Sequence, residues 1–480
     1  MKTAGSTLRD LENVVSMAAD LLSASPLDHH TTRRHIEALL FLKLITDIGR
    51  DLSANNKIAA SQPAWSTFIF SPEYDWKNLQ PDRPDLPHRL NLALQVAECK
   101  NYETLEGIFS GLDFQEMSSG GPRILEHLVH LISTADLRPS LFGEAANLGH
   151  VFENLTAKML PSPELGEFNV PSELADLIAG LVDPKINESI IDPVCGSGRL
   201  LSALVRHNGS GIGPIAGQDW RTRSLSLCKS NLFAHGASAR IKTGNSLYSP
   251  LRDELGDLLR ADVVVGNPPF GLPLERHDNL APGIPKLLQG INTRVRGEYS
   301  FVIHMLEIAR EGSGRVAAIV PLGALFRREE IEIRRRLIEE NLLSCVIALP
   351  AKLFTGTKIA VAILFLQKDK RNKKLLFIDA SQSFVTSGRL NLLSAYDTDK
   401  IVRSFRDFKE VENFSYVAEP QEIRDNDFQL NVNRYISQNE PKRYRSNILQ
   451  LRESIAETES ELAEVRGEIE TLIDALGIRS

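Results

Sequence analysis

Between residues 150 and 385, short apolar runs rich in valine and isoleucine alternate with segments of helical periodicity. Strands that alternate with helices predict an α/β fold built on a parallel, doubly wound sheet. Such a sheet binds ligands at the carboxyl ends of its strands, so the residues that follow each run are the first candidates for a site. The runs are Ser189–Ile191, Pro214–Ala216, Val263–Val265, Val316–Val320, Val346–Leu349 and Val361–Leu366.

The chain has 480 residues, enough for two to four structural units at roughly 100–200 residues each. We expect residues 1–145 to form a helical domain, because apolar residues recur at helical spacing over Leu8–Leu22, Ile36–Ile45 and Ile124–Ile132. A proline-rich break lies between residues 72 and 87. This part carries no motif with chemistry, and its apolar stripes are typical of a packing or docking domain.

We assign the sheet to a catalytic domain over residues 146–437, followed by a C-terminal helix over residues 438–480. The helix carries a heptad pattern of about four and a half repeats, which predicts a coiled-coil docking element. A helix that packs on its own domain is the alternative. The residues seven apart are Ile448, Ile455, Leu462, Ile469 and Leu476.

Composition limits the class of protein and its partners. The net charge is −7, whereas proteins that grip DNA alone over many phosphates are usually basic. Either the basic residues are clustered on part of the surface, or a partner makes most of the contacts with DNA.

The four cysteines, Cys99, Cys195, Cys228 and Cys345, form no Cys-x-x-Cys pair, which argues against zinc and against a disulfide framework. No secretory signal and no apolar stretch of ~18–20 residues is visible, so we expect a cytoplasmic protein without a metal site or membrane span.

A glycine-rich turn follows the first predicted strand and is the candidate site for a cofactor. Glycines at such a turn let the backbone approach a ligand and tighten the start of the next helix. The turn has no Walker lysine, which argues against a P-loop, and a nicotinamide-binding turn is the main alternative. The candidate residues are Asp192, Cys195, Gly196, Ser197, Gly198 and Arg199.

Asp219 ends the second predicted strand, about twenty residues after the glycine-rich turn. An acidic residue there can accept hydrogen bonds from both hydroxyls of a ribose, and the alternative is an ordinary surface carboxylate. A third strand over Ile241–Lys242 leads to Asn245, whose amide offers both a donor and an acceptor.

The tetrapeptide Asn267, Pro268, Pro269 and Phe270 directly follows the strand Val263–Val265. An exocyclic amine on an aromatic ring is a poor nucleophile, because its lone pair is delocalised. The Asn267 side-chain carbonyl and the Pro268 backbone carbonyl can accept from its two N–H groups and favour a tetrahedral nitrogen. The two prolines hold both acceptors in place beforehand. Phe270 offers a face for stacking an extruded base. A purely structural Pro-Pro turn is the alternative.

Two resemblances to known families indicate which cofactor and which substrate this chemistry uses. The run Asp192–Arg199 resembles the first motif of class I S-adenosylmethionine-dependent methyltransferases. A series of segments over nearly the whole chain resembles the modification subunit of type I restriction–modification systems, in the N6-adenine DNA methyltransferase family. The segments are 149–153, 297–306, 314–320, 321–327, 333–334, 349–350, 353–359, 377–381 and 430–435.

The resemblance implies a Rossmann-like fold, the cofactor S-adenosylmethionine and methylation of a flipped adenine in double-stranded DNA. It implies a complex in which two modification subunits bind one specificity subunit, and which a restriction subunit can join. It also implies that Asn245 reads the adenine of the cofactor, that the neighbourhood of Trp220 packs against it, and that one further segment closes over the methionine end. That segment is Gly166, Glu167, Phe168, Asn169, Val170 and Pro171.

Asn169 and Val170 replace the Tyr and Thr of the family pattern, and Asn245 replaces the more usual Asp. These departures keep a second class of function open, a non-catalytic scaffold that retains the fold. A third possibility is a self-sufficient methyltransferase. We also predict a mobile loop over Gly271–Arg296 that orders around the extruded base and brings Arg294 and Arg296 near phosphates. A solvated surface loop is the alternative. The run Arg334–Arg336 is interpreted as a solvated helix face, with a phosphate-binding patch as the alternative.

Overall fold

The structure is a computed structural model. It describes residues 28–54, 62–118, 122–158, 169–272 and 297–436, together with Asn13, Val14, Met17, Lys57 and Ile455. The chain divides into two compact units, Met1–Val432 and Asn433–Ser480. Apart from these single residues, the helix predicted over Leu8–Leu22 and the heptad segment 444–476 lie outside the described residues. The predicted N-terminal helix, the predicted coiled coil and the predicted domain boundary after residue 145 therefore stay predictions.

The N-terminal part is helical, as predicted. The apolar stripe over Ile36–Ile45 lies within helix α2 (His29–Ser53), and the stripe over Ile124–Ile132 lies within α8 (Pro122–Ser133). Asp28 caps α2 by accepting a hydrogen bond from the Thr31 N–H at 2.9 Å, which satisfies one of the donors that a helix start leaves unpaired. The other helices here are α4 (Pro63–Ser66), η1 (Pro72–Tyr74), η2 (Trp76–Asn78), α5 (Leu86–Lys100), α6 (Tyr102–Leu105), α7 (Phe114–Ser118), η3 (Pro139–Leu141) and α9 (Ala145–Lys158).

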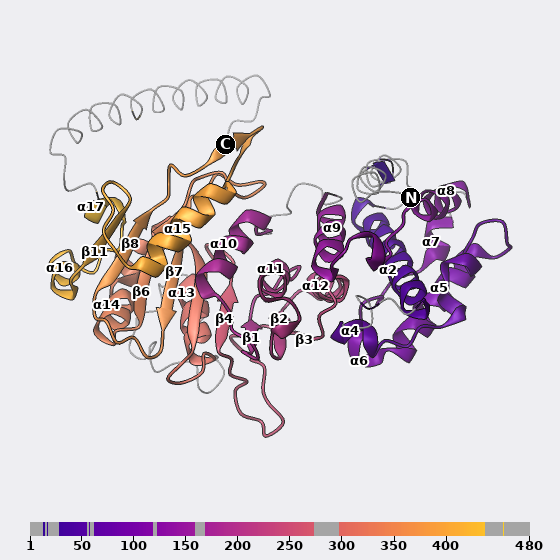
Figure 1. Cartoon of the computed structure of the whole chain (residues 1–480), viewed down its shortest axis with the longest axis horizontal. Helices are drawn as coiled ribbons and strands as arrows, with labels where there is room; N and C mark the ends of the chain where they lie inside the picture. Colours follow the sequence, from indigo (N-terminus) through magenta and orange to yellow (C-terminus); the bar gives the residue numbers. More distant parts are fainter. Residues whose placement is uncertain are drawn as a thin grey trace, which may run out of the picture. The chain divides into compact units, whose positions relative to one another are not determined.

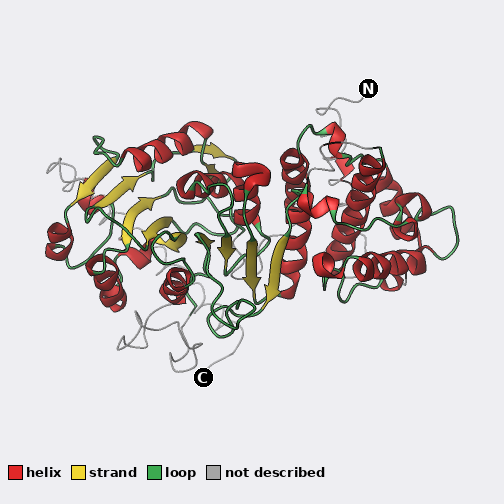
Figure 2. Ribbon diagram, turned by 60° about the horizontal axis from the view of Figure 1, so that its bottom comes forward, coloured by secondary structure: helices red, strands yellow, loops and turns green. Residues whose placement is uncertain are grey.

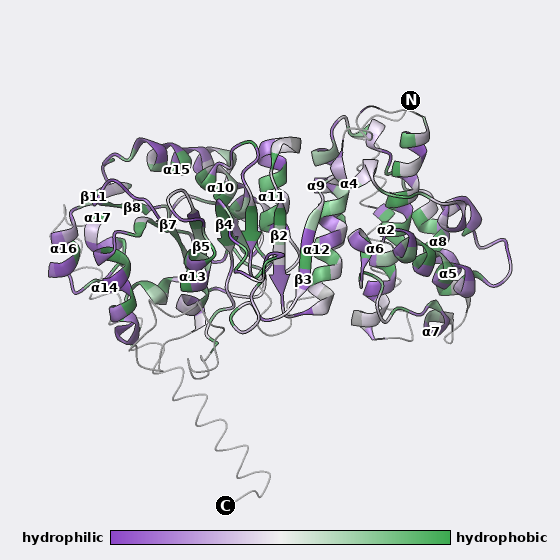
Figure 3. Cartoon of the chain, turned by 90° about the horizontal axis from the view of Figure 1, so that it is seen from below, coloured by the Kyte–Doolittle hydropathy of each residue, from purple (hydrophilic) through white to green (hydrophobic). Residues whose placement is uncertain are grey.

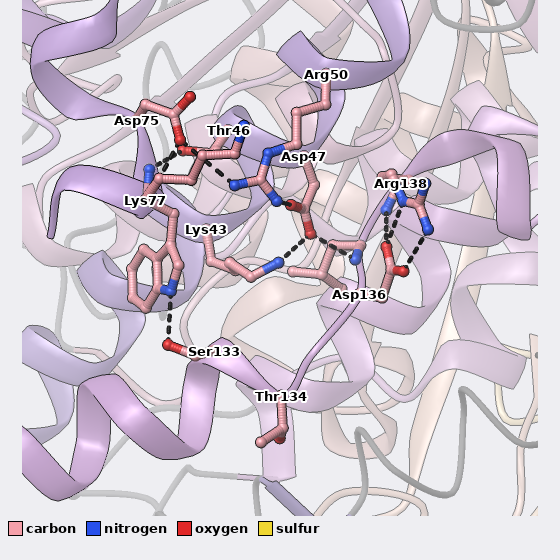
Figure 4. A network of polar contacts seen from close by, with 12 residues as sticks. Lys43, Thr46, Asp47, Arg50, Asp75, Lys77, Ser133, Thr134, Asp136 and Arg138 are labelled. Atoms are coloured by element: carbon pink, nitrogen blue, oxygen red, sulfur yellow. Dashed lines mark hydrogen bonds and ion pairs between the residues drawn. The ribbon is translucent and has the colours of Figure 1, made fainter. Parts of the chain in front are cut away.

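A buried polar network ties α2 to the segment that follows α8 (Figure 4). The Asp47 carboxylate contacts the Lys43 ammonium and accepts from the Leu137 N–H at 2.8 Å and from Arg50 Nη1 at 3.2 Å. Burial raises the pKa of Asp47 and lowers that of Lys43. A buried ion pair is tolerated when further hydrogen bonds satisfy it, and here they fix the position of α2 in its domain.

The described residues include a sheet of nine strands in the order β11-β8-β6-β7-β5-β4-β1-β2-β3 (Figure 1). Each strand predicted from the sequence is confirmed. The strands are β1 (Ile190–Asp192), β2 (Ile215–Asp219), β3 (Ala239–Thr243), β4 (Val263–Gly266), β5 (Arg315–Pro321), β6 (Leu343–Ala348), β7 (Val361–Gln367), β8 (Leu375–Asp379) and β11 (Ser415–Ala418). A separate two-stranded sheet pairs β9 (Val385–Ser387) with β10 (Leu390–Leu392).

The sheet is mostly parallel, but two strands run against it. β7 is antiparallel to both of its neighbours, β5 and β6, and β11 is antiparallel to β8. The chain between β6 and β7 spans residues 349–360 and contains no helix. A parallel neighbour needs a crossover connection, so this short link returns the chain beside β6 in the opposite direction. The predicted parallel arrangement is thus confirmed for most of the sheet and does not hold for β7, while β11 was not predicted from the sequence.

Helices cover both faces of the sheet (Figure 2). Alternate side chains of β5 and β7, such as Ile319 and Ile363, share one core with residues of α10 and α15. Phe365 meets Phe405 of α15 at 4.6 Å between ring centroids. β4 is buried along its whole length and is drawn green in Figure 3. The helices of the first unit that follow the N-terminal part are α10 (Ser172–Val182), α11 (Arg199–Asn208), η4 (Gly209–Gly211), α12 (Thr222–Ala234), α13 (Gly297–Glu307), η6 (Leu322–Leu325), η7 (Arg328–Glu330), α14 (Ile331–Glu339), α15 (Ala395–Asp407) and α16 (Pro420–Asp425). The second unit begins with α17 (Asn433–Ile436).

Helix α12 joins the sheet to the N-terminal helices within the first unit. Phe233, near its end, belongs to the core of the helical part, where its ring lies 5.5 Å from that of Phe41. The Trp65 indole N–H donates to the Phe233 carbonyl at 2.6 Å. On α9, the buried Glu153 carboxylate pairs with Arg206 of α11 at 3.2 Å. None of the helices within the described ranges is long and apolar enough to cross a membrane.

Candidate functional site

The carboxyl ends of β1, β2 and β4 meet at one cavity of about 440 Å³. This is where the topology of a doubly wound sheet places a ligand, because the connections leave the sheet in different directions there. The volume falls within the ~300–1,000 Å³ typical of sites for small molecules. The lining residues come from segments far apart in the chain: Arg33, Glu37, Asn169, Val170, Asp192–Ser197, Arg199, Leu200, Asp219–Arg221, Ser224, Leu227, Gly244–Ser246, Asn267–Phe270, Leu272 and Phe301.

The glycine-rich turn after β1 forms one wall of the cavity. Gly196 and Gly198 have φ of +51° and +81°, in the left-handed region that favours glycine. Their surroundings differ. No atom of the described structure lies within 4 Å of the position of a Cβ on Gly196, whereas a Cβ on Gly198 would lie 2.7 Å from the Cys228 sulfur. Gly196 therefore leaves room at the turn, and Gly198 lets α12 pack against the turn.

Asp219, 5% exposed, lies at the end of β2 opposite this turn. Its Oδ2 accepts from the Gly196 N–H at 3.0 Å, and its Oδ1 accepts from the Arg221 N–H at 2.9 Å and from Arg221 Nε at 3.3 Å. A carboxylate offers about four acceptor positions, so one position on Oδ2 is left for a ligand hydroxyl.

Asp192, at the end of β1, is 1% exposed and accepts from the Val194 N–H at 2.9 Å. Burial raises the pKa of its carboxyl to about 8, a net value in which the Val194 N–H opposes the rise and the Asp219 carboxylate adds a smaller contribution to it. The two neighbouring carboxyls thus differ in their surroundings, since Asp192 has one backbone N–H partner and Asp219 has two.

The segment after β3 closes another side of the cavity. Asn245 lines the cavity with Gly244 and Ser246. Its side-chain Oδ1 accepts from the Leu247 N–H at 3.0 Å, which holds the side chain of Asn245 in place. Gly244 has φ of +149°, and a Cβ there would lie 2.7 Å from the Gln218 amide nitrogen.

The Asn-Pro-Pro-Phe turn follows β4, and all four of its residues line the cavity. The Phe270 ring meets the Phe354 ring edge-on, with centroids 6.2 Å apart and planes at 83°. Before the turn, a Cβ on Gly266 would lie 3.1 Å from the Val194 side chain, so glycine lets β4 pass close to the turn after β1. The two motifs, more than seventy residues apart in the sequence, therefore face one cavity.

The structure brings together most of the residues predicted for the site. Asn169, which is exposed, and Val170, which is buried, line the cavity beside the turn residues. Gly198 faces Cys228 and does not line the cavity, and neither does Pro171, the N-cap residue of α10. Gly166, Glu167 and Phe168 lie outside the described residues. Trp220 lines the cavity and is 67% exposed.

Sequence reasoning missed the contribution of the N-terminal part. Arg33 and Glu37 of α2 line the cavity and are 2% and 16% exposed, and Arg33 Nε pairs with Glu37 Oε1 at 2.7 Å. No signal in the sequence could have found them, since they lie some 160 residues before the glycine-rich turn and belong to no motif.

Two predictions for arginines have different outcomes. Arg294 and Arg296 of the predicted mobile loop lie outside the described residues. The solvated face over Arg334–Arg336 was wrong for Arg334, which is fully buried and donates to the Phe428 carbonyl at 2.8 Å. Burial also removes it from any phosphate-binding patch. Arg335 and Arg336 pair with Glu332 on the same helix.

Comparisons with known proteins identify the family and the fold of the chain. A family model described as N-6 DNA Methylase matches residues 144–443. The type I restriction enzyme MjaVIII methylase subunit of Methanocaldococcus jannaschii is 32% identical over 393 residues, which cover 76% of this chain and 65% of that protein. The MjaVII methylase subunit of the same organism is 29% identical over 433 residues, which cover 84% and 72%.

Among solved structures, the type I restriction-modification system methyltransferase subunit from Streptococcus thermophilus matches with a TM-score of 0.78 at 20% identity. The match covers 91% of this chain and 100% of that one. At this identity the likeness shows the fold. The chain spans just under two thirds of the length of the MjaVIII subunit.

Proposed function

The chain belongs to the N-6 DNA methylase family, and from this premise we propose that it transfers a methyl group from S-adenosylmethionine to the exocyclic amine of a flipped adenine in DNA. One observation carries the proposal. The glycine-rich turn after β1, Asp219 after β2 and the Asn-Pro-Pro-Phe turn after β4 line the same cavity. A cofactor and an extruded base can therefore meet there without any large movement of the sheet.

The residues of the cavity suit this cofactor. Asp219 retains an acceptor position for a ribose hydroxyl, and Gly196 leaves open space where a side chain would block a ligand. Asn245 can exchange hydrogen bonds with an adenine edge, and the exposed Trp220 ring offers a stacking face beside it. When bound, S-adenosylmethionine supplies a methyl group made electrophilic by its sulfonium.

The chain's own contribution to the reaction comes from the Asn-Pro-Pro-Phe turn. The Asn267 side-chain carbonyl and the Pro268 backbone carbonyl accept from the two N–H groups of the target amine, which draws the nitrogen towards a tetrahedral shape. Pro268 and Pro269 fix the backbone, so the acceptors need no reorganisation when the base arrives. Phe270 stacks on the extruded base, at about 1–3 kcal/mol.

We further propose that the chain acts as the modification subunit of a type I restriction–modification complex in the cytoplasm. Two copies would bind one specificity subunit that reads the DNA sequence, and a restriction subunit can join. The relatives are named methylase subunits of type I restriction enzymes, and the net charge of −7 suits a chain whose DNA grip comes largely from a partner.

Replacing Asn267 with alanine tests the reaction. We expect Asn267→Ala to lower methyl transfer at least about 100-fold, the usual cost of removing one preorganised hydrogen-bonding group. Cofactor affinity, measured by calorimetry, should stay within about twofold, because Asn267 acts on the target amine. Transfer is measured with labelled cofactor and DNA in the complex purified from the native host. Asn372→Ala, on the exposed surface, is the control. Full activity of Asn267→Ala would refute the mechanism.

The same assay separates the subunit from a self-sufficient enzyme. The purified chain alone should methylate DNA poorly, and the specificity subunit should restore the reaction. Sequence-specific methylation by the chain alone would instead support a self-sufficient methyltransferase. No cofactor binding by the chain or by the complex would favour a non-catalytic scaffold.

A further inference from the structure

A buried carboxylate contacts the backbone of the residue that follows the Asn-Pro-Pro-Phe turn. Glu298, the second residue of α13, is fully buried, and its Oε1 accepts from the Gly271 N–H at 2.8 Å. Gly271 is the residue after Phe270. One residue further on, the Leu272 carbonyl accepts from the Gly297 N–H at 2.9 Å. The chain leaving the turn is therefore fastened to the start of α13 at two successive positions.

Arg327 supports this carboxylate. Its Nη1 lies 3.7 Å from Glu298 Oε1 and 3.1 Å from Glu330 Oε1. A Cβ on Gly323 would lie 3.0 Å from Arg327 Nε, so glycine at that position makes room for the guanidinium. Burying a carboxylate costs several kcal/mol unless charges and hydrogen bonds compensate. In the described structure Glu298 Oε2 has no hydrogen-bond partner, so the compensation is concentrated on Oε1, the oxygen that faces Gly271.

The segment that carries Arg327 is itself held from two sides. The Tyr299 hydroxyl donates to the Ala324 carbonyl at 3.0 Å. Arg334 donates to the same carbonyl at 3.1 Å and to the Arg327 carbonyl at 2.9 Å. Three segments without an assigned role, 297–306, 321–327 and 333–334, thus converge behind the Asn-Pro-Pro-Phe turn.

We propose that Glu298 is a positioning residue for the Asn-Pro-Pro-Phe turn and that Arg327 is its charged support; this rests on the function proposed above. The prolines restrict the backbone only up to Pro269. Beyond them, Gly271 has φ of +72°, in a region open to glycine. Because a peptide unit is planar, a hydrogen bond to the Gly271 N–H fixes the plane that also contains the Phe270 carbonyl. The contact therefore sets the backbone direction at Phe270 and, through it, the ring that stacks on the base.

Two substitutions separate positioning from packing. Glu298→Ala should lower kcat by about tenfold to hundredfold, as expected when a reacting group is displaced by about 1 Å. Cofactor affinity by calorimetry should stay within about twofold. Glu298→Gln keeps an oxygen that can accept from Gly271, so it should recover most of the activity. A 2-aminopurine at the target position should report altered stacking of the extruded base in the alanine variant. Glu332→Gln, in a surface ion pair, is the matched control.

Hydrogen exchange tests the contact independently of any activity. In Glu298→Ala, the peptide covering residues 267–272 should exchange faster than in the wild type, and in Glu298→Gln it should stay protected. Unchanged exchange in the alanine variant overturns the proposal, whatever the protein methylates. Equal loss of melting temperature, cofactor binding and kcat in both variants also overturns it, because that pattern indicates packing alone. Should Glu298→Ala fail to fold, Arg327→Gln removes the charged support and should speed exchange in the same peptide. A wild-type complex that methylates no adenine refutes the function but leaves the exchange result standing.

Discussion

Asp192 and Asp219 lie at the carboxyl ends of neighbouring strands and have different surroundings. Asp219 accepts hydrogen bonds from two backbone N–H groups and lies 3.3 Å from Nε of Arg221. Asp192 has one backbone N–H and almost complete burial, and burial raises its pKa to about 8. Because a protonated carboxyl carries no charge, the raised pKa of Asp192 limits the repulsion between the two neighbouring carboxyls.

The raised pKa of Asp192 predicts how the stability of the folded chain depends on pH. The usual pKa of an aspartate is near 3.8, and that of Asp192 in the folded chain is about 8. Between these values the folded chain holds a proton that the unfolded chain releases. The stabilising contribution of Asp192 is therefore complete below about pH 4 and is lost as the pH rises through 8. Asp192→Asn removes this titration, so its melting temperature should rise relative to that of the wild type between pH 5 and pH 8.

Thermal denaturation at intervals of half a pH unit measures the effect. Glu254→Gln, at an exposed loop position, should follow the wild-type curve throughout. Parallel curves for Asp192→Asn and the wild type would show that Asp192 does not titrate in this window.

The turn between β1 and α11 shows how one element serves both packing and binding. Gly196 and Gly198 both have positive φ, but only Gly198 is in close contact with another element, at Cys228 of α12. The same turn donates the Gly196 N–H to Asp219. Its backbone therefore joins β1, β2 and α12 around the cavity, and each glycine has a separate reason to lack a side chain.

Alanine at the two glycines should separate these roles. Gly198→Ala combines a left-handed φ, at about 1–2 kcal/mol, with a contact of 2.7 Å to the Cys228 sulfur, so its melting temperature should fall by several degrees. The double variant Gly198→Ala, Cys228→Ala should recover the part due to the contact. Gly196→Ala meets no neighbour, so it should destabilise less but lower cofactor affinity, because its methyl group fills open space at the turn. Denaturation and calorimetry measure both, and equal effects of the two variants would contradict the assignment.

At a larger scale, the N-terminal helices and the sheet belong to one compact unit. The fold and the family predicted from the sequence are confirmed by the match to N-6 DNA Methylase over residues 144–443 and by the Streptococcus thermophilus structure. The family match covers almost none of the N-terminal part, yet α2 supplies Arg33 and Glu37 to the cavity wall. Helix α12 carries side chains in the cores of both parts.

This arrangement predicts that a substitution on α2 weakens cofactor binding. Arg33→Ala removes a buried side chain from the cavity wall and leaves the Glu37 carboxylate without its 2.7 Å partner. We expect about tenfold weaker binding of S-adenosylmethionine by calorimetry, equivalent to about 1.4 kcal/mol. The neighbouring Arg34→Ala is the control, because Arg34 donates to the Ser110 carbonyl and does not line this cavity. Equal affinities in both variants and the wild type would show that the catalytic domain binds the cofactor without α2.

The amino-acid sequence alone determined the features that follow from local patterns. The strands follow from runs of apolar residues, and the turn after β1 follows from glycines that tolerate a left-handed φ. The rigidity of the Asn-Pro-Pro-Phe turn follows from its two prolines, which restrict the backbone next to Asn267. Each rule operates within a few residues, so it can be applied without knowing what lies nearby in space.

Only the tertiary structure decided which distant residues meet. It placed Arg33 of α2 at the cavity, buried Arg334 that the charge pattern had assigned to solvent, and set Glu298 behind Gly271. It also turned β7 against its neighbours. A side chain's partners depend on how the whole chain is packed, and a charged residue that finds enough hydrogen bonds can be buried although its residue type favours water.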